Sequence, residues 1–196
     1  MIPRILHRTL PATPAPIMGK CWESVLKHCE GWELRTYQSP RDANDWPMTR
    51  RLWGYCKDNA MQADLVRLEA LWNLGGIYLD ADVELLHPLD DLLDGGPFAA
   101  WEDANQLCNA VIGAPPKHPA IRDALDVLEV QIQMGAPPVG PRALTQSWAE
   151  RDDVRLLPRE SFYPYGYWEK ERAADDFTEV EGCYGVHHWA ATWFKP

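Results

Sequence analysis

The sequence of 196 residues lacks the features that mark several specialised classes of protein. It contains no run near the roughly 20 apolar residues of a membrane-spanning helix, and its first residues lack the apolar segment of a signal peptide. Its five cysteines are scattered, odd in number and without a CxxC pair, which favours reduced thiols over a disulfide framework or a zinc knuckle. These absences predict a cytoplasmic protein with no membrane span.

Positive charge is also scarce, because 19 lysines and arginines face 29 aspartates and glutamates and give a formal net charge of −10. An acidic surface repels polyanions, so neither nucleic acid nor an anionic membrane is an expected partner. An anionic ligand would need a local source of positive charge, and a metal ion is the usual one. The hydrophobic share of 46% is that of an ordinary globular protein with a substantial core.

Apolar patterns alternate between strand-like and helix-like along the chain. The strongest helix pattern has Asp58 as a candidate N-cap and ends at the pair Gly75-Gly76. We expect strands at 2–10, 32–38, 77–83, 98–103, 109–114 and 154–158, and helices at 17–29, 58–74, 119–134 and 141–150. Strands that alternate with helices predict an α/β fold with a mostly parallel sheet, and the absence of a linker predicts one compact domain over residues 1–196.

The stretch GGIYLDADVELL, residues 75–86, places two carboxylates at the end of an apolar strand pattern. Alternate side chains of a strand share a face, so Asp80 and Asp82 would point the same way as Tyr78. Ligands of parallel α/β proteins bind at such strand ends. Neighbouring carboxylates stay ionised together when a cation neutralises them, and oxygen ligands suit Mg²⁺ or Mn²⁺. The alternative is a pair of solvated turn aspartates.

Five segments, in the right order, resemble the DxD-containing sugar transferases of glycosyltransferase family 32, which are related to the clostridial glucosylating toxins. QADLVRLEALWNLGGIYLDADV, residues 62–83, resembles the signature helix and strand of that family. IPRILHRTL, NAVIGAPPKHP, VGPRALTQ and YGVHHWAATW resemble its flanking segments. The resemblance implies a GT-A-type (Rossmann-like) domain, a nucleotide-sugar donor, Mn²⁺ or Mg²⁺ as cofactor, and retention of anomeric configuration.

The same resemblance implies roles for individual residues. Asp64 and Arg67 would hold the donor sugar and diphosphate region, Asp80 would contact the donor ribose and sugar, and Asp82 would ligate the metal. The other implied donor contacts are Ile5, His7, Tyr78, Asn109 and Trp193, and the implied metal ligand from the tail is His187 or His188. Residues 182–196 correspond to a C-terminal lid.

Elementary chemistry leaves alternatives beside these roles. Asp64 and Arg67 stand three residues apart on one helix face, where they could act together or form an ordinary exposed ion pair. His187 and His188 are adjacent, so only one of them can face a metal from an extended segment, and either could instead be a plain core or surface histidine.

Two other functions compete with sugar transfer. Phosphohydrolases of the haloacid-dehalogenase type use the first aspartate of such a pair as a nucleophile, here Asp80, but they want Thr or Val where this chain has Glu84. A non-catalytic nucleotide-sugar-binding module is the second alternative. The donor (a UDP- or GDP-sugar) and the acceptor (a carbohydrate, a lipid-linked glycan or a protein) stay open.

Overall fold

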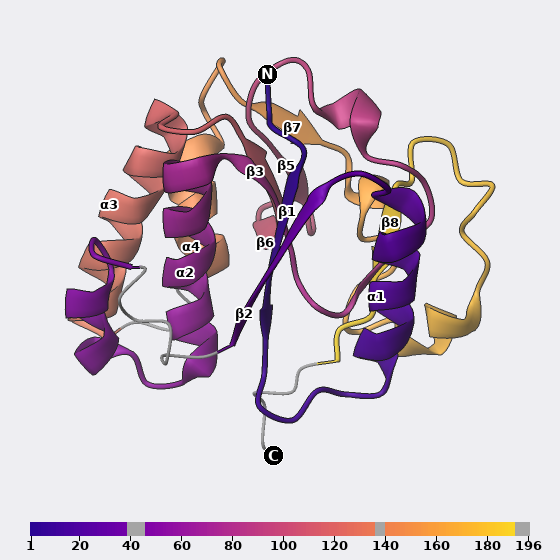
Figure 1. The fold of residues 1–196 in the computed structure, drawn as a ribbon, viewed down its shortest axis with the longest axis horizontal. Coiled ribbons are helices and arrows are strands. Elements are labelled where there is room, and N and C mark those ends of the chain that lie inside the picture. The colour runs from indigo at the N-terminus through magenta and orange to yellow at the C-terminus, as the bar shows by residue number, and fades with distance from the viewer. Residues whose placement is uncertain (39–45, 136–139, 191–196) are drawn as a thin grey trace.

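A computed structural model of the chain describes residues 1–38, 46–135 and 140–190, and its centre is a twisted six-stranded sheet (Figure 1). The strands lie in the order β2-β1-β3-β6-β5-β7. Their bounds are Ile5–Leu10 (β1), Glu33–Gln38 (β2), Gly76–Leu79 (β3), Phe98–Trp101 (β5), Leu107–Ala114 (β6) and Arg155–Leu157 (β7). Within these strands β6 alone runs against its neighbours. The predicted α/β fold with a mostly parallel sheet is therefore confirmed.

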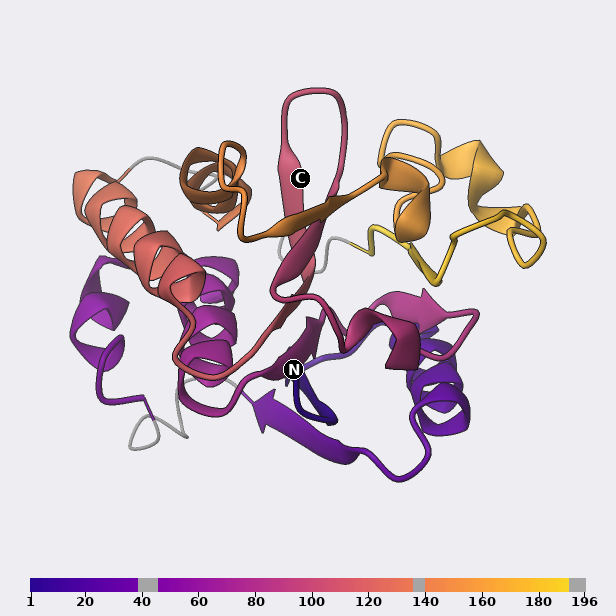
Figure 2. The same cartoon turned by 90° about the horizontal axis from the view of Figure 1, so that it is seen from above.

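Helices cover both faces of this sheet (Figures 1 and 2). One face carries α2, α3 and α4, and the opposite face carries α1 together with a small two-stranded sheet of β4 and β8. The bounds are Ile17–His28 (α1), Asn59–Leu74 (α2), Pro119–Met134 (α3), Gly140–Trp148 (α4), Val83–Leu85 (β4) and Gly185–His187 (β8). Short 3-10 helices span Arg50–Tyr55 (η2), Asp90–Leu92 (η3), Arg159–Ser161 (η4) and Lys170–Ala174 (η5).

Helix α2 leads directly into the strand that ends at the aspartates. Its N-cap is Asp58, whose side chain accepts a hydrogen bond from Met61 N at 2.9 Å, as the sequence predicted. Gly75 ends the helix with φ +65°, a conformation that favours glycine. Gly76 has φ +105°, and a Cβ there would collide with the Ile5 carbonyl oxygen. Gly76 thus lets β3 pack closely against β1.

The strand predicted over residues 77–83 is wrong at its end, because β3 stops at Leu79 and a turn follows. Asp80 N still donates to Ala110 O of β6 at 2.8 Å, and Val83 N then donates back to Asp80 O at 3.0 Å. The chain resumes as β4, which leaves the main sheet and pairs antiparallel with β8 from the tail. Asp80 and Asp82 are therefore turn residues and do not alternate along one strand.

Two further features of the structure concern the cysteines and the apolar character of the helices. All five cysteines are free thiols, and four of them are buried. Among the described helices, none combines the length and apolar character needed to cross a membrane.

Candidate active site

The turn after β3 and the strand β8 bring together three side chains that could bind a metal. Asp80, Asp82 and His187 each offer one ligand atom, and these atoms all lie within 4.8 Å of one another. Asp82 accepts a hydrogen bond from Ala190 N at 2.8 Å through its carboxylate, and its backbone oxygen accepts one from His188 N at 3.0 Å. The tail is thus tied to the aspartate turn by backbone hydrogen bonds.

The charge state of this group suits a divalent cation. Burial alone would raise the pKa of Asp82, but the neighbouring His187 and the Ala190 N–H outweigh it and lower that pKa to about 2. Burial likewise opposes the charge on His187, yet Asp82, whose Oδ1 lies 3.3 Å from its Nε2, raises the pKa of His187 well above its usual range. A metal ion held by Asp82 and His187 would have to displace the proton of this imidazole, because a histidine ligand binds metal as a neutral ring. Two carboxylates and an imidazole fit Mn²⁺ better than Mg²⁺, which prefers oxygen ligands alone.

His188 lies outside the metal-binding group. Its Nε2 is 2.8 Å from Glu84 Oε2, and Lys20 Nζ contacts the same oxygen at 3.0 Å. Because His187 and His188 are consecutive in an extended segment, their side chains point to opposite sides. Glu84, the residue that disfavours a phosphatase, here fixes His188 away from the aspartates.

Arg67 connects the aspartate turn with α2 and β6. Its side chain is 6% exposed, and its Nη2 lies 3.2 Å from Asp64 Oδ1 and 3.4 Å from Asp80 Oδ1. Nη1 donates to the backbone oxygen of Asn109, and the guanidinium stands over the ring of Tyr78 at 4.5 Å. Tyr78 in turn donates its hydroxyl proton to Asp80 at 2.9 Å. An exposed Asp64–Arg67 pair is thereby excluded, and five of the predicted site residues form one buried network.

Asp64 lies at one end of this network, and its contacts are the ones that the sequence predicted least. Burial raises its pKa to about 6, against the opposing effect of Arg67. One of its oxygens accepts from Asn109 Nδ2 at 2.7 Å and the other from Gly140 N at 3.1 Å. Gly140 was not predicted as a site residue, although it belongs to the VGPRALTQ segment that resembles the family.

Alanine at Gly140 should disrupt this network. A Cβ there would overlap Asn109 Nδ2 and lie 2.5 Å from Asp64 Cγ, so one of these buried polar groups must move. We expect a loss of about 1–3 kcal/mol in the free energy of unfolding, measured by urea denaturation, together with weaker donor binding. The matched control is Gly19→Ala, because nothing lies within 4 Å of a Cβ at Gly19 of α1. Equal stability of the two variants would contradict the tight contact.

Two predicted donor contacts, Ile5 and His7, lie toward the other end of β1. Ile5 packs against Gly76, and His7 is fully buried with Nε2 2.8 Å from Gly75 O and Nδ1 2.7 Å from Tyr37 Oη. Burial lowers the pKa of His7 to about 4, as expected for a neutral core histidine. The structure therefore does not bring these two residues to the aspartates. Trp193 lies outside the described residues.

Two nearby side chains were given no firm role by the sequence. Thr9 Oγ1 lies 2.7 Å from the Tyr78 hydroxyl and extends the network to β1. Glu102 follows β5 directly, is 7% exposed and accepts from Gln106 Nε2 at 3.2 Å. Burial raises the pKa of Glu102, and the hydrogen bond from Gln106 opposes that effect.

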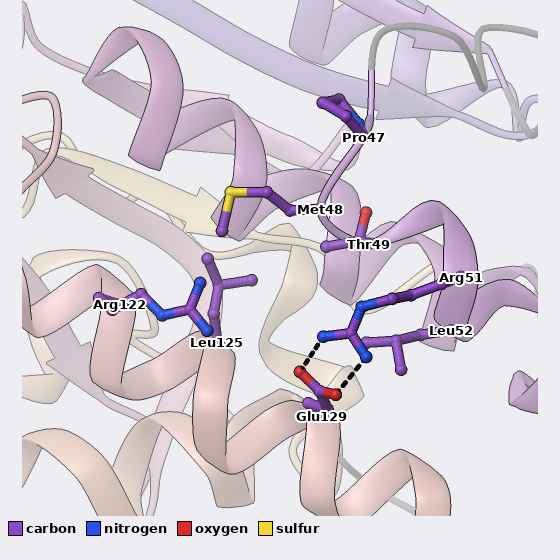
Figure 3. A pocket seen from close by; sticks show the side chains of 8 residues that line it. All are labelled: Pro47, Met48, Thr49, Arg51, Leu52, Arg122, Leu125 and Glu129. Atoms are coloured by element: carbon purple, nitrogen blue, oxygen red, sulfur yellow. Dashed lines mark hydrogen bonds and ion pairs between the residues drawn. The ribbon is translucent and has the colours of Figure 1, made fainter.

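A pocket of about 250 Å³ lies elsewhere, between α3 and the segment that leads into η2 (Figure 3). Its arginines already have acidic partners, since Arg51 pairs with Glu129 and Arg122 pairs with Asp126. Its lining shares no residue with the Asp80–Asp82–His187 group. Volume alone therefore does not identify the candidate site, and the convergence of titratable groups does.

Comparison with known families agrees with this assignment. Residues 20–99, which contain most of α1, all of α2 and β3, and both aspartates, match the family described as "Glycosyltransferase sugar-binding region containing DXD motif". This part of the chain is similar to that family of DXD-containing glycosyltransferases. The resemblance inferred from the sequence segments is thereby confirmed.

Individual relatives are glycosyltransferases of longer chain length. Inositol phosphoceramide mannosyltransferase 3 of Schizosaccharomyces pombe is 31% identical over 126 residues, which cover 60% of this chain and 35% of that protein. Alpha-1,4-N-acetylglucosaminyltransferase of Homo sapiens is 24% identical over 147 residues, which cover 66% of this chain and 42% of that protein. The chain therefore spans less than half the length of these curated relatives.

Solved structures share the fold. The PaToxG glycosyltransferase superposes with a TM-score of 0.55 at 16% identity over 74% of this chain and 67% of that chain. A glycosyltransferase involved in the glycosylation of the major capsid of PBCV-1 superposes with a TM-score of 0.51 at 13% identity over 96% of this chain and 94% of that chain. The predicted GT-A-like fold is confirmed by these similarities.

Proposed function

We propose that this protein is a metal-dependent glycosyltransferase that moves a sugar from a nucleotide-sugar donor to an acceptor with retention of configuration. The observation that carries this proposal is the Asp80–Asp82–His187 group, in which two aspartates of the DXD-containing region, directly after β3, meet a histidine of β8. The names of the relatives, a mannosyltransferase and an N-acetylglucosaminyltransferase, support a hexose derivative as the transferred group. UDP and GDP are both candidates for the donor nucleotide.

Asp82 and His187 are the proposed holders of the cation, and Asp80 faces the donor ribose and sugar. When bound there, Mn²⁺ or Mg²⁺ supplies a Lewis acid that neutralises the leaving diphosphate. The low pKa of Asp82 keeps its carboxylate ionised at neutral pH, and the Tyr78 hydroxyl orients Asp80. A buried, pre-oriented carboxylate needs little rearrangement when the donor arrives.

Asp64, Arg67 and Asn109 are proposed to orient the donor sugar. Their mutual hydrogen bonds hold them in one arrangement, and correct positioning can supply a large part of a rate enhancement. Arg67 also adds positive charge beside the expected diphosphate. We infer front-face attack, with the leaving phosphate accepting the proton of the acceptor, and not a glycosidase-like double displacement.

The competing functions have weaker support. A phosphohydrolase of the haloacid-dehalogenase type would want Thr or Val where this chain has Glu84, and Glu84 here contacts His188. The nature of the acceptor (a carbohydrate, a lipid-linked glycan or a protein), the cytoplasmic location, the single domain and the lid role of residues 182–196 stay predictions.

A thermal-shift screen tests the proposal. UDP- and GDP-sugars are added with and without Mn²⁺, and at about 100 times the dissociation constant a ligand of the folded state stabilises it by about 2.7 kcal/mol. We expect at least one nucleotide sugar to raise the melting temperature only when Mn²⁺ is present, and to be slowly hydrolysed. Turnover of a generic phosphate ester without nucleotide-sugar binding would favour the phosphohydrolase. Binding without hydrolysis or transfer would favour a non-catalytic module.

A further inference from the structure

A continuous run of aromatic rings leads from the candidate metal site to the protein surface. The ring of Trp189 lies against His187 at a centroid distance of 4.1 Å, and Tyr167 follows at 6.1 Å from Trp189. Trp168 then meets Tyr167 edge-on at 4.9 Å. Tyr167, Trp168 and Trp189 are called the aromatic ledge below. The ledge begins in direct contact with a proposed metal ligand.

The outer part of the ledge is exposed and held in place. Tyr167 is 58% exposed and Trp168 is 50% exposed. Exposure of adjacent large rings to water costs free energy, and such a patch often marks a binding surface. A Cβ at Gly166 would lie 2.7 Å from the Trp168 ring, so this glycine lets the indole pack against the backbone. The Arg159 guanidinium lies 5.5 Å from the same ring on the ledge. The rings are therefore ordered before any ligand arrives.

The inner part of the ledge carries backbone strain. Trp189 has φ +50°, a left-handed conformation that is unusual for any residue except glycine and strained for a bulky one. This conformation places the indole over His187 while its Nε1 donates to Tyr165 O at 3.0 Å, and the next residue, Ala190, donates to Asp82. The strained residue thus joins the metal-binding group to the exposed rings.

We propose that the aromatic ledge binds a sugar ring of the acceptor, so that the acceptor substrate is a carbohydrate or carries one. This inference rests on the proposed function, because it places the acceptor beside the donor site. The apolar C–H face of a pyranose covers an aromatic ring, while its hydroxyls stay at the ring edge, where water and polar groups can bind them. A lipid surface fits less well, because the described part of the ledge exposes only the two large rings of Tyr167 and Trp168, and the net charge of −10 repels anionic lipids.

Ligand-observed NMR can test the ledge directly. Methyl glycosides of mannose, glucose, galactose and N-acetylglucosamine serve as probes, and saturation-transfer difference spectra are recorded with UDP or GDP and Mg²⁺, which unlike Mn²⁺ is diamagnetic and leaves the ligand signals sharp. We expect at least one glycoside to bind, and Trp168→Ala to weaken it about fivefold to tenfold, since about 50 Å² of apolar contact is lost. Tyr167→Ala should act in the same direction. The matched control is Tyr55→Ala, because Tyr55 is 57% exposed but lies in η2, on the opposite side of the sheet.

The outcomes separate this inference from the proposed function. The proposed sugar binding by the ledge is contradicted if no methyl glycoside binds the parent protein. It is equally contradicted if Tyr167→Ala and Trp168→Ala both bind the glycoside as the parent does. It is also overturned if neutral phosphatidylcholine vesicles shift the tryptophan fluorescence while no glycoside binds, which would indicate a lipid surface. Nucleotide-dependent melting shifts in Trp168→Ala should equal those of the parent. Glycoside binding without any nucleotide binding would instead contradict the proposed function and leave the ledge a sugar site.

Discussion

Replacing Asp82 by asparagine is expected to lower donor hydrolysis by about a thousandfold, because a Lewis acid at a leaving group is worth several kcal/mol. Asparagine keeps the size of the side chain and one oxygen that can accept from Ala190 N, but it removes the negative charge. The rate is measured as release of UDP or GDP from the donor, with water in place of the acceptor. The same variant should need far more Mn²⁺ to reach its maximal rate.

The control for this variant is Asp90→Asn, which removes an exposed carboxylate that pairs with Arg4 and is not part of the Asp80–Asp82–His187 group. That variant should keep the parent's rate and Mn²⁺ dependence. Circular dichroism must show that Asp82→Asn is folded, so that loss of rate reports on the site. A variant that retains more than about a tenth of the rate, with an unchanged Mn²⁺ requirement, would contradict metal binding by Asp82.

The parts of the fold that could be predicted depend on local signals. Helix α2 begins and ends where Asp58 and the glycine pair predicted, and α3 covers residues 119–134 as its apolar spacing predicted. Such caps and periods act over one or two turns and are visible in the chain itself. By contrast, β4 and β8 have three residues each and pair across about 100 residues of sequence. Three residues are too few for a recognisable alternation, so only the tertiary contact defines these strands.

The candidate site shows the same division. The sequence placed Asp80 and Asp82 together for a reason that the structure corrects, since a turn and not a strand face orients them. The spacing of Asp64 and Arg67 revealed that they share a helix face, but not that this face is buried beneath Asn109 and Gly140. Burial of that kind depends on segments far away in sequence.

The predicted roles of His187 and His7 have different outcomes, and the reason is again contact between distant segments. His187 reaches Asp82 because β8 pairs with β4, and nothing in the dipeptide itself distinguishes it from His188. His7 resembles a ligand-binding residue in sequence, yet its ring nitrogens face Gly75 O and the Tyr37 hydroxyl inside the core. The resemblance to the family therefore predicts which positions of the chain correspond more reliably than it predicts what each side chain contacts.

Replacing Arg67 by methionine should have the largest effect on stability among single changes at this site. Its guanidinium is buried between the carboxylates of Asp64 and Asp80, and its removal leaves the buried Asp64 and the partly buried Asp80 without their cation. We expect a loss of about 3–5 kcal/mol in the free energy of unfolding, measured by urea denaturation. The control is Arg122→Met, which removes an exposed ion pair with Asp126 within α3 and should cost less than about 1 kcal/mol.

A double variant separates the loss of charge pairing from the loss of packing around Arg67. Asp64→Asn removes one of the two carboxylates that Arg67→Met leaves uncompensated, so the double variant should be more stable than the sum of the single losses predicts, by about 0.5–3 kcal/mol. Arg67→Lys should fall between parent and Arg67→Met, because an ammonium keeps the charge but cannot contact Asp64, Asp80 and the Asn109 oxygen together. Strict additivity in the cycle, or an Arg67→Met variant no less stable than Arg122→Met, would mean that the guanidinium does not organise the carboxylates. If Arg67→Met then lost donor binding and Arg67→Lys partly restored it, the contribution of Arg67 to donor binding would come from direct contact with the diphosphate.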